Sequence, residues 1–193
     1  MFDTLPNIET VKRILSAGLK APTNDHMRNW EFVIITEKDT IASILNIIPD
    51  KATHDEIESK MDTWQLNDKC QREMYRDAIP KQYEMLYKSG CLILPFFKQS
   101  SPLLKPETLS SLNAFASIWC CIENILLAAS VEGLSCALRI PQDNELEHII
   151  NILNHPKYYL MPCYISLGYA SPDAVINRQH EPEIEDRIHL NCW

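Results

Sequence analysis

The chain has 193 residues, 46% of them hydrophobic, which is enough to bury a core of normal size within one domain. Its net charge of −8 argues against a nucleic-acid backbone or an anionic membrane as the main partner, because both are bound through clustered Lys and Arg. The sequence has no apolar run of about eighteen residues and no signal-peptide pattern, so we expect a cytoplasmic protein.

The seven cysteines form no Cys-x-x-Cys pair, and most lie within apolar stretches. This favours reduced, buried thiols over disulfides or zinc ligands. His54, Asp55 and Glu58 have a spacing that could suggest a metal site, but they lie in a charge-rich stretch where a solvated helix face is the favoured interpretation. We therefore predict no metal site.

The first predicted element is an amphipathic helix over residues 8–20, where apolar residues recur near a 3.6-residue period. Asn7 can cap its start, and Pro22 stops it. A buried strand over 30–36 and a short helix over 38–48 follow. Between the first helix and this strand lies a polar loop.

That loop, residues 21–30, reads Ala-Pro-Thr-Asn-Asp-His-Met-Arg-Asn-Trp. Its hydroxyl, amide, imidazole and guanidinium groups give dense hydrogen-bonding capacity beside a buried strand, which is typical of a ligand-binding loop. Other interpretations stay open. Thr23 and Asn24 could only turn the chain, His26 could be a structural histidine, and Arg28 could form a surface ion pair.

Residues 51–88 change character, because fifteen of the thirty-eight are charged and Pro80 interrupts them. We interpret them as a polar helical excursion. Solvated helices with a few core anchors are the favoured form, and a lid over a site is the alternative.

A second strand is predicted over 91–98, where Pro95 suggests an edge strand or a bulge. The longest predicted helix, over about 109–131, is apolar nearly all round. Such a helix should be buried on every side, so we expect it to be central and shared across a subunit interface. Gly133 ends it.

The remaining predicted elements are a strand over 134–140, a helix over 144–153 capped by Asp143 or Asn144, and a strand over 159–167. A polar tail over about 170–193 should be either disordered or wrapped over another surface. Together the elements predict a single α+β domain over residues 1–193.

The polar loop resembles the segment A-P-S-x-x-N-x-Q-P-W-x-F of nitroreductase-family flavoproteins. The Ala, Pro, Trp and Phe recur at the same offsets, and Thr23 stands for Ser. His26, Arg28 and Asn29 replace the Asn, the Gln and the second Pro of that segment.

Three later segments extend the resemblance over roughly residues 8–193. Residues 123–135 resemble the long-helix signature Q/E-N-x-x-L-A-A followed by G-L-G. Residues 167–169 resemble a late strand that ends in G-Y-P. Arg178 with residues 183–189 resembles a C-terminal R-x-P-x-E-E-x-V-H.

The resemblance implies a nitroreductase-like α+β fold, in which helices flank a central mixed or antiparallel sheet around a long buried central helix. It implies a homodimer whose C-terminal arms embrace the partner, with FMN in two sites at the interface. NAD(P)H would give a hydride to the FMN, and a nitroaromatic, quinone-like or related small-molecule electrophile would take the electrons in a ping-pong reaction. The flavin N5 does the chemistry in such enzymes, so no catalytic side chain is implied.

By position, the resemblance implies ten FMN-binding residues from four parts of the chain. They are Pro22, Thr23, Asn24, His26 and Arg28 of the loop, Ser117 of the long helix, Leu138, Arg139 and Ile140 of the third strand, and Arg178 of the tail. The Ile140 backbone N–H is expected near flavin N5, where it would stabilise the electron density added on reduction. Arg178 is expected to pair with the phosphate. Asn124 is expected to be a structural hydrogen-bonder.

Members of the family normally begin with an R-R-S-x-R segment whose arginines clamp the FMN phosphate, and nothing like it precedes residue 8 here. Arg28 is expected to supply part of that charge. The departure leaves a second hypothesis open, a non-catalytic or weakly flavin-binding dimeric member of the family. The physiological substrate and the choice between NADH and NADPH also stay open.

Overall fold

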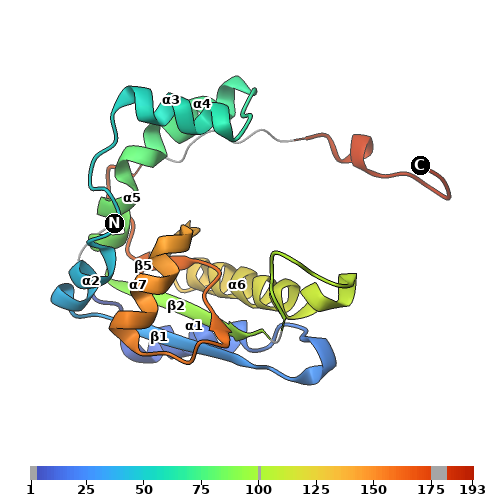
Figure 1. Cartoon of the computed structure of the whole chain (residues 1–193), viewed down its shortest axis with the longest axis horizontal. Helices are drawn as coiled ribbons and strands as arrows, with labels where there is room; N and C mark the ends of the chain where they lie inside the picture. The colour runs from blue at the N-terminus through green and yellow to red at the C-terminus, as the bar shows by residue number, and fades with distance from the viewer. Residues whose placement is uncertain (1–3, 100, 175–181) are drawn as a thin grey trace. The chain divides into compact units, whose positions relative to one another are not determined.

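The computed structural model describes residues 4–99, 101–174 and 182–193 (Figure 1). Its α-helices are α1 Ile8–Gly18, α2 Lys38–Leu45, α3 His54–Thr63, α4 Lys69–Ala78, α5 Gln82–Tyr87, α6 Asn113–Val131 and α7 Asp143–Leu153. Its strands are β1 Trp30–Ile35, β2 Cys91–Lys98, β3 Ser135–Arg139, β4 Tyr159–Leu160 and β5 Tyr164–Gly168. Its short 3₁₀ turns are η1 Asn24–His26, η2 Ile79–Lys81, η3 Leu109–Leu112 and η4 Ile184–Arg187.

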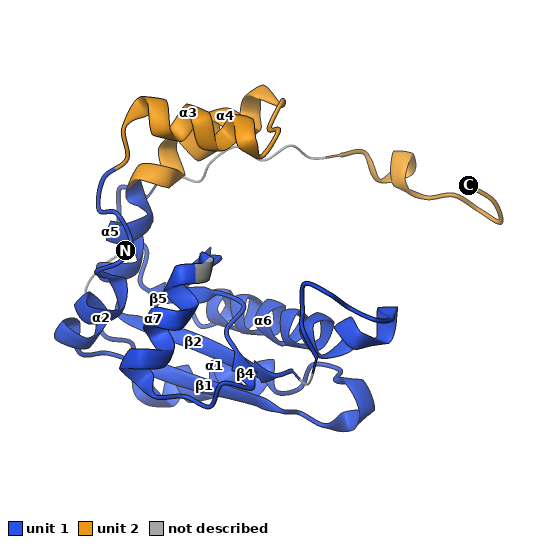
Figure 2. Cartoon of the chain, viewed as in Figure 1, with its two compact units in different colours: residues 1–51, 81–174 blue, residues 52–80, 175–193 orange. Residues whose placement is uncertain are grey.

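The chain divides into two compact units (Figure 2). The first contains residues 1–51 and 81–174, and it holds the whole sheet. The second contains residues 52–80 and 175–193. A single domain over residues 1–193 stays a prediction.

The sheet has five strands in the order β1-β2-β5-β3, and β4 pairs with the far end of β2. All pairings are antiparallel, with Trp30 opposite Phe97 and Arg139 opposite Tyr164. The prediction of an α+β fold around such a sheet is confirmed. Strands β1 and β3 therefore form its two edges.

Pro95 lies in an interior strand, and the prediction of an edge strand is wrong for β2. The amide of Lys98 donates to Asn29 on the β1 side, whereas that of Gln99 donates to Tyr158 on the other side. By this alternation, the amide that Pro95 lacks would point away from β1. There the ladder is interrupted, because β5 pairs with residues 91–93 and β4 with residues 97–98. The proline therefore costs no ladder bond.

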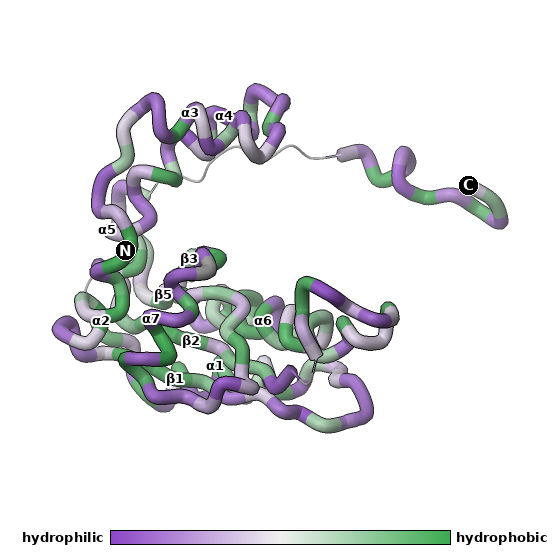
Figure 3. The backbone as a smooth tube through the Cα atoms, viewed as in Figure 1, coloured by the Kyte–Doolittle hydropathy of each residue, from purple (hydrophilic) through white to green (hydrophobic). Residues whose placement is uncertain are grey.

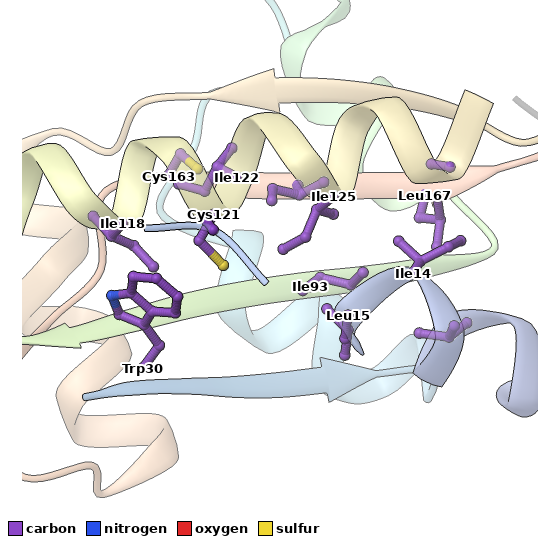
Figure 4. Close-up of a cluster of buried hydrophobic side chains, with 14 of the residues drawn as sticks. Ile14, Leu15, Trp30, Ile93, Ile118, Cys121, Ile122, Ile125, Cys163 and Leu167 are labelled. Carbon is purple, nitrogen blue, oxygen red and sulfur yellow. The ribbon is translucent and has the colours of Figure 1, made fainter. Parts of the chain in front are cut away.

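The two faces of the sheet bury separate hydrophobic clusters. Alternate residues of β2 divide between them, since Ile93 and Phe97 point to one cluster and Leu92 and Leu94 to the other. Helices α1 and α6 cover the first face, as Figure 4 shows for Ile14, Ile118 and Ile125 and their neighbours. Helices α2, α5 and α7 contribute to the second cluster. The result is a three-layer unit with helices on both faces.

Close packing joins α1 to α6. A Cβ on Gly18 would approach the Ile125 side chain to 2.7 Å, so only glycine allows this contact without rearrangement. The Asn124 amide donates to the Ala17 carbonyl at 3.3 Å. Asn124 is thus the structural hydrogen-bonder that was expected, and Asn7 caps α1 by accepting from the Glu9 amide.

Helix α6 buries one face and leaves the other open in the single chain. Ile118, Ile122 and Ile125 are buried, whereas Leu127 is 56% and Val131 88% exposed. The apolar character of the helix is visible in Figure 3. Within Leu109–Val131, an 18-residue window with a mean hydropathy of 1.7 is long and apolar enough to cross a membrane, a property that core helices can share. The buried face of the helix packs on the sheet.

Several predicted boundaries were wrong. Helix α1 ends at Gly18 rather than at residue 20, α6 begins at Asn113 after a 3₁₀ turn, and β1 and β3 are shorter than predicted. Helix α2 ends at Leu45 rather than at residue 48. The strand predicted over 159–167 is split into β4 and β5, because Pro162 lacks an amide and interrupts the ladder. Helix α7 starts at Asp143, and its N-cap Gln142 makes no side-chain bond to the helix.

In the second unit, α3 and α4 pack around a small core of Ile57, Met61 and Ile79. The Glu58 carboxylate accepts from Arg72 at 2.6 Å and from Arg76 at 2.5 Å. Hydrogen bonds from these arginines lower the Glu58 pKa to about 2. Glu58 therefore holds the helix pair together.

Candidate functional site

A cavity of about 260 Å³ opens in the first unit beside the loop that precedes β1. Its lining combines one cation, one hydroxyl and two amides with aromatic and aliphatic walls. The residues are Thr23, Asn24, Met27, Asn29, Trp30, Phe97, Lys98 and Ala114. Such a mixture suits a ligand that joins an apolar or aromatic body to hydroxyl or anionic groups.

A backbone-to-side-chain hydrogen bond fixes the loop to α6. The Asn24 backbone N–H donates to the Ser117 hydroxyl at 3.1 Å, and that hydroxyl donates to the Asn113 carbonyl at 2.7 Å. The Thr23 hydroxyl accepts from the Arg28 amide at 3.3 Å and so closes the loop upon itself. Ser117 thus positions the two pocket residues Thr23 and Asn24.

Three non-glycine residues of this loop adopt left-handed backbone conformations. Their φ angles are 49° for Asp25, 53° for His26 and 45° for Arg28. Asp and His tolerate this region better than most residues do, whereas Arg does not. His26 and Arg28 are exposed, and neither lines the cavity. Strain of this kind gathers at functional sites.

Lys98 supplies the positive charge of the cavity. Its backbone amide donates to the Asn29 carbonyl at 3.1 Å, which anchors the end of β2 to the loop. Its ammonium lies 5.4 Å from the centre of the Tyr158 ring, a cation–π distance. The strand pairing thus brings a cation 70 positions away in sequence beside the polar loop.

The other predicted site residues of the first unit lie at the end of β3. Leu138 is half-buried and Ile140 is 54% exposed. Arg139 is 7% exposed, and its guanidinium donates to Glu145 and Gln82. Because its guanidinium is engaged in these bonds, Arg139 would contact a ligand through its backbone and not through its charged side chain.

The two groups of predicted residues lie toward opposite edges of the sheet. The loop leads into β1 at one edge, and Leu138–Ile140 leave β3 at the other. Three strand spacings of about 4.8 Å separate those edges, about 14 Å in all. Among the described residues of a single chain, Ser117 joins the group at the loop through its bond to Asn24, and Leu138, Arg139 and Ile140 form a separate group.

The sequence predictions missed most of the cavity. The lining residues not identified as site residues are Met27, Asn29, Trp30, Phe97, Lys98 and Ala114. Trp30 and Phe97 lie opposite each other in the sheet, so knowledge of the strand register would have identified both as lining residues. Pro22 of the loop is exposed and does not line the cavity, and Arg178 lies outside the described residues.

Comparisons with known proteins extend these observations. The model of the nitroreductase family matches residues 3–169. A comparison with curated proteins found no match.

Among solved structures, iodotyrosine deiodinase bound to FMN and 3-iodo-L-tyrosine superposes with a TM-score of 0.70 at 17% identity, covering 99% of this chain and 91% of that one. A BluB-like flavoprotein from Clostridium difficile 630 gives 0.67 at 18% identity, with coverage of 98% and 93%. An FMN-dependent nitroreductase from Clostridium difficile R20291 gives 0.62 at 18% identity, with coverage of 99% and 91%. At these identities the likeness shows the fold. Because the family model matches most of this chain, the chain belongs to the nitroreductase family.

Proposed function

We propose that the protein is an FMN-dependent oxidoreductase that uses NAD(P)H to reduce nitroaromatic, quinone-like or related electrophiles. The observation that supports this most is the cavity beside the loop, where Thr23, Asn24 and Lys98 stand against Trp30 and Phe97. Family membership and FMN-bound structures of the same fold point to the same cofactor.

The donor set of the cavity fits FMN. Hydroxyl and amide groups suit the ribityl chain, and an ammonium suits a phosphate that carries close to two negative charges. FMN, when bound, would supply hydride transfer from NAD(P)H to the electrophile. The chain would bind and orient it, so no metal or side-chain nucleophile is proposed.

We propose a homodimer, which the separation of the two residue groups supports. The loop and the end of β3 lie toward opposite sheet edges, and a second subunit that contributes one of the two groups would bring both to one FMN. The exposed face of α6, with Leu127 and Val131, offers an apolar surface for that subunit. We propose no nucleic-acid or membrane partner, and a cytoplasmic location.

The phosphate contacts are proposed at three cations. Lys98 lines the cavity. Arg28 lies in the same loop with an exposed side chain, and Arg178 is carried over from the resemblance alone. Arg178→Ala should weaken FMN more than riboflavin, and Arg28→Gln should weaken FMN by about 1 to 3 kcal/mol, the range for a charge-assisted bond.

The alternative is a dimeric family member that binds flavin weakly or performs no catalysis. Titration of the purified protein with FMN, followed by flavin fluorescence, separates the two. Saturable binding and oxidation of NADH or NADPH in the presence of a quinone would support the enzyme. Absence of both at high micromolar FMN would contradict it.

A further inference from the structure

The end of β3 and the start of α7 are tied by a buried polar cluster that the proposed function leaves unused. The Arg139 guanidinium donates to both Glu145 carboxylate oxygens, at 2.5 and 2.6 Å. The Tyr164 hydroxyl donates to the same carboxylate at 2.9 Å, and Gln82 of α5 accepts from Arg139 Nε at 3.0 Å. Four segments of the first unit thus meet at one ion pair.

The ion pair and the tyrosine of this cluster are buried, and Gln82 is half-buried. Arg139 is 7% and Glu145 2% exposed, and Tyr164 is fully buried. Burial in apolar surroundings and the nearby Glu145 charge raise the pKa of Tyr164, so its phenol stays a donor. A buried ion pair is weak evidence for stability, because hydrophobic residues of similar size often serve as well. What the bidentate pair does fix is the relative position of the two segments that it joins.

The geometry that it fixes is a short connection. Only residues 140–142 join β3 to α7. The Arg139–Glu145 ion pair links the last residue of β3 to the first turn of α7 across this connection. Pro141 fixes its own φ and holds Ile140 in an extended conformation. The N-cap residue of α7 makes no side-chain bond to the helix. The ion pair of Glu145 with Arg139 therefore attaches the N-terminal end of α7 to β3.

We propose that Arg139 and Glu145 are positioning residues that hold the Ile140 backbone N–H at the flavin. This inference rests on the proposed function, which brings Ile140 to the cofactor. An amide held in place stabilises added electron density without reorganising, whereas a mobile amide does not. The ion pair therefore sets how much more tightly reduced than oxidised FMN is bound.

The test uses the full-length protein and three variants. In the triple variant Arg139→Met, Glu145→Leu, Tyr164→Phe, the cluster becomes apolar without leaving a buried phenol unpaired. Arg139→Lys keeps the charge but loses the two-pronged contact. The matched control is Arg13→Met with Glu132→Leu, which removes a bidentate Arg–Glu pair that joins α1 to the end of α6.

Two measurements are made on each protein. ¹⁵N relaxation of the Ile140 and Gln142 amides, without flavin, should give order parameters near 0.85 in the wild type and below about 0.6 in the triple variant. Titration with oxidised and reduced FMN should show the affinity ratio falling about tenfold, a shift of roughly 30 mV for a two-electron couple. Arg139→Lys should lie between, and the control should match the wild type.

Unchanged order parameters in the triple variant would overturn the inference, as would mobile amides with an unchanged affinity ratio. A wild type that binds no FMN would refute the proposed function instead. In that case the order parameters still decide whether the ion pair positions Ile140.

Discussion

The Asn24 backbone N–H donates to the Ser117 hydroxyl across 3.1 Å, and this bond attaches the candidate binding loop to the long helix. Both groups are at least partly buried, so loss of the hydroxyl leaves the amide without its acceptor. The bond therefore links the stability of the protein to the shape of the cavity.

Ser117→Ala should lower the free energy of unfolding by about 1 to 2 kcal/mol, the cost of an unsatisfied, partly buried donor. Urea denaturation measures it. Ser130→Ala is a matched control, because Ser130 lies on the same helix and bonds to the carbonyl four residues back, as Ser117 does. The control should change stability little, since alanine favours the helix. Equal losses in both variants would contradict the role of Asn24.

Lys98→Gln should weaken FMN binding about tenfold to a hundredfold, since a charged hydrogen bond contributes about 1.5 to 3 kcal/mol. Riboflavin, which lacks the phosphate, should be affected much less. Titration of both ligands measures the difference. Lys105→Gln, in the loop after β2 and outside the cavity lining, is the control. Parallel losses for FMN and riboflavin would mean that Lys98 acts on the loop rather than on the phosphate.

Glu58→Gln should remove a pH dependence of the α3–α4 pair. The Glu58 pKa is lowered from 4.5 to about 2 in the folded chain, so the stabilisation is complete above pH 4.5 and is lost as pH falls towards 2. The Trp64 indole N–H signal in NMR reports on the pair, because Trp64 packs against Tyr75 of α4.

In the wild type, the chemical shift of the Trp64 indole N–H should move from its folded-state value to its unfolded-state value between about pH 4.5 and 2. In Glu58→Gln, the pair should be already weakened at pH 6 and no longer respond over that range. Glu73→Gln is the control, because Glu73 lies 3.9 Å from its partner Lys69. An identical acid transition in wild type and Glu58→Gln would show that other carboxylates govern it.

The proposed dimer should depend on the exposed face of α6. Leu127→Glu with Val131→Glu should convert it to a monomer at micromolar concentration, since a dimer of this type buries more than about 2,000 Å² of largely apolar surface. Sedimentation velocity measures the change. Leu104→Glu alters an exposed leucine outside α6 and should leave the dimer intact. A wild-type protein that sediments as a monomer would refute the dimer itself.

Local signals in the sequence were enough for the elements but not for the cavity. The periodicity of residues 8–20 and the apolar run of 91–98 identified α1 and β2, because burial of one face or one strand is a local property. The loop at Thr23 and Asn24 was found because its polar residues are contiguous. Lys98 was not, since it reaches the loop only through the pairing of β1 with β2.

The Arg139–Glu145 pair shows the same limit. An arginine at the end of an apolar strand is expected to face solvent, and six positions of spacing across a strand and a helix carry no periodic signal. Its partner Tyr164 is paired with it only in the folded sheet. Both the contact of Lys98 with the loop and the Arg139–Glu145 pair depend on the register between segments distant in sequence. That register cannot be read from any one segment alone.

The left-handed residues before β1 have a consequence for engineering. Glycine adopts such φ angles without the Cβ clash that costs other residues roughly 1 to 2 kcal/mol. Arg28, the least tolerant of the three, is thus where glycine would relieve most strain while deleting one of the proposed phosphate contacts. A search for heat-resistant variants should therefore select Arg28→Gly, whereas a search for activity should reject it. At this position of the loop, a gain in stability comes with a loss of function.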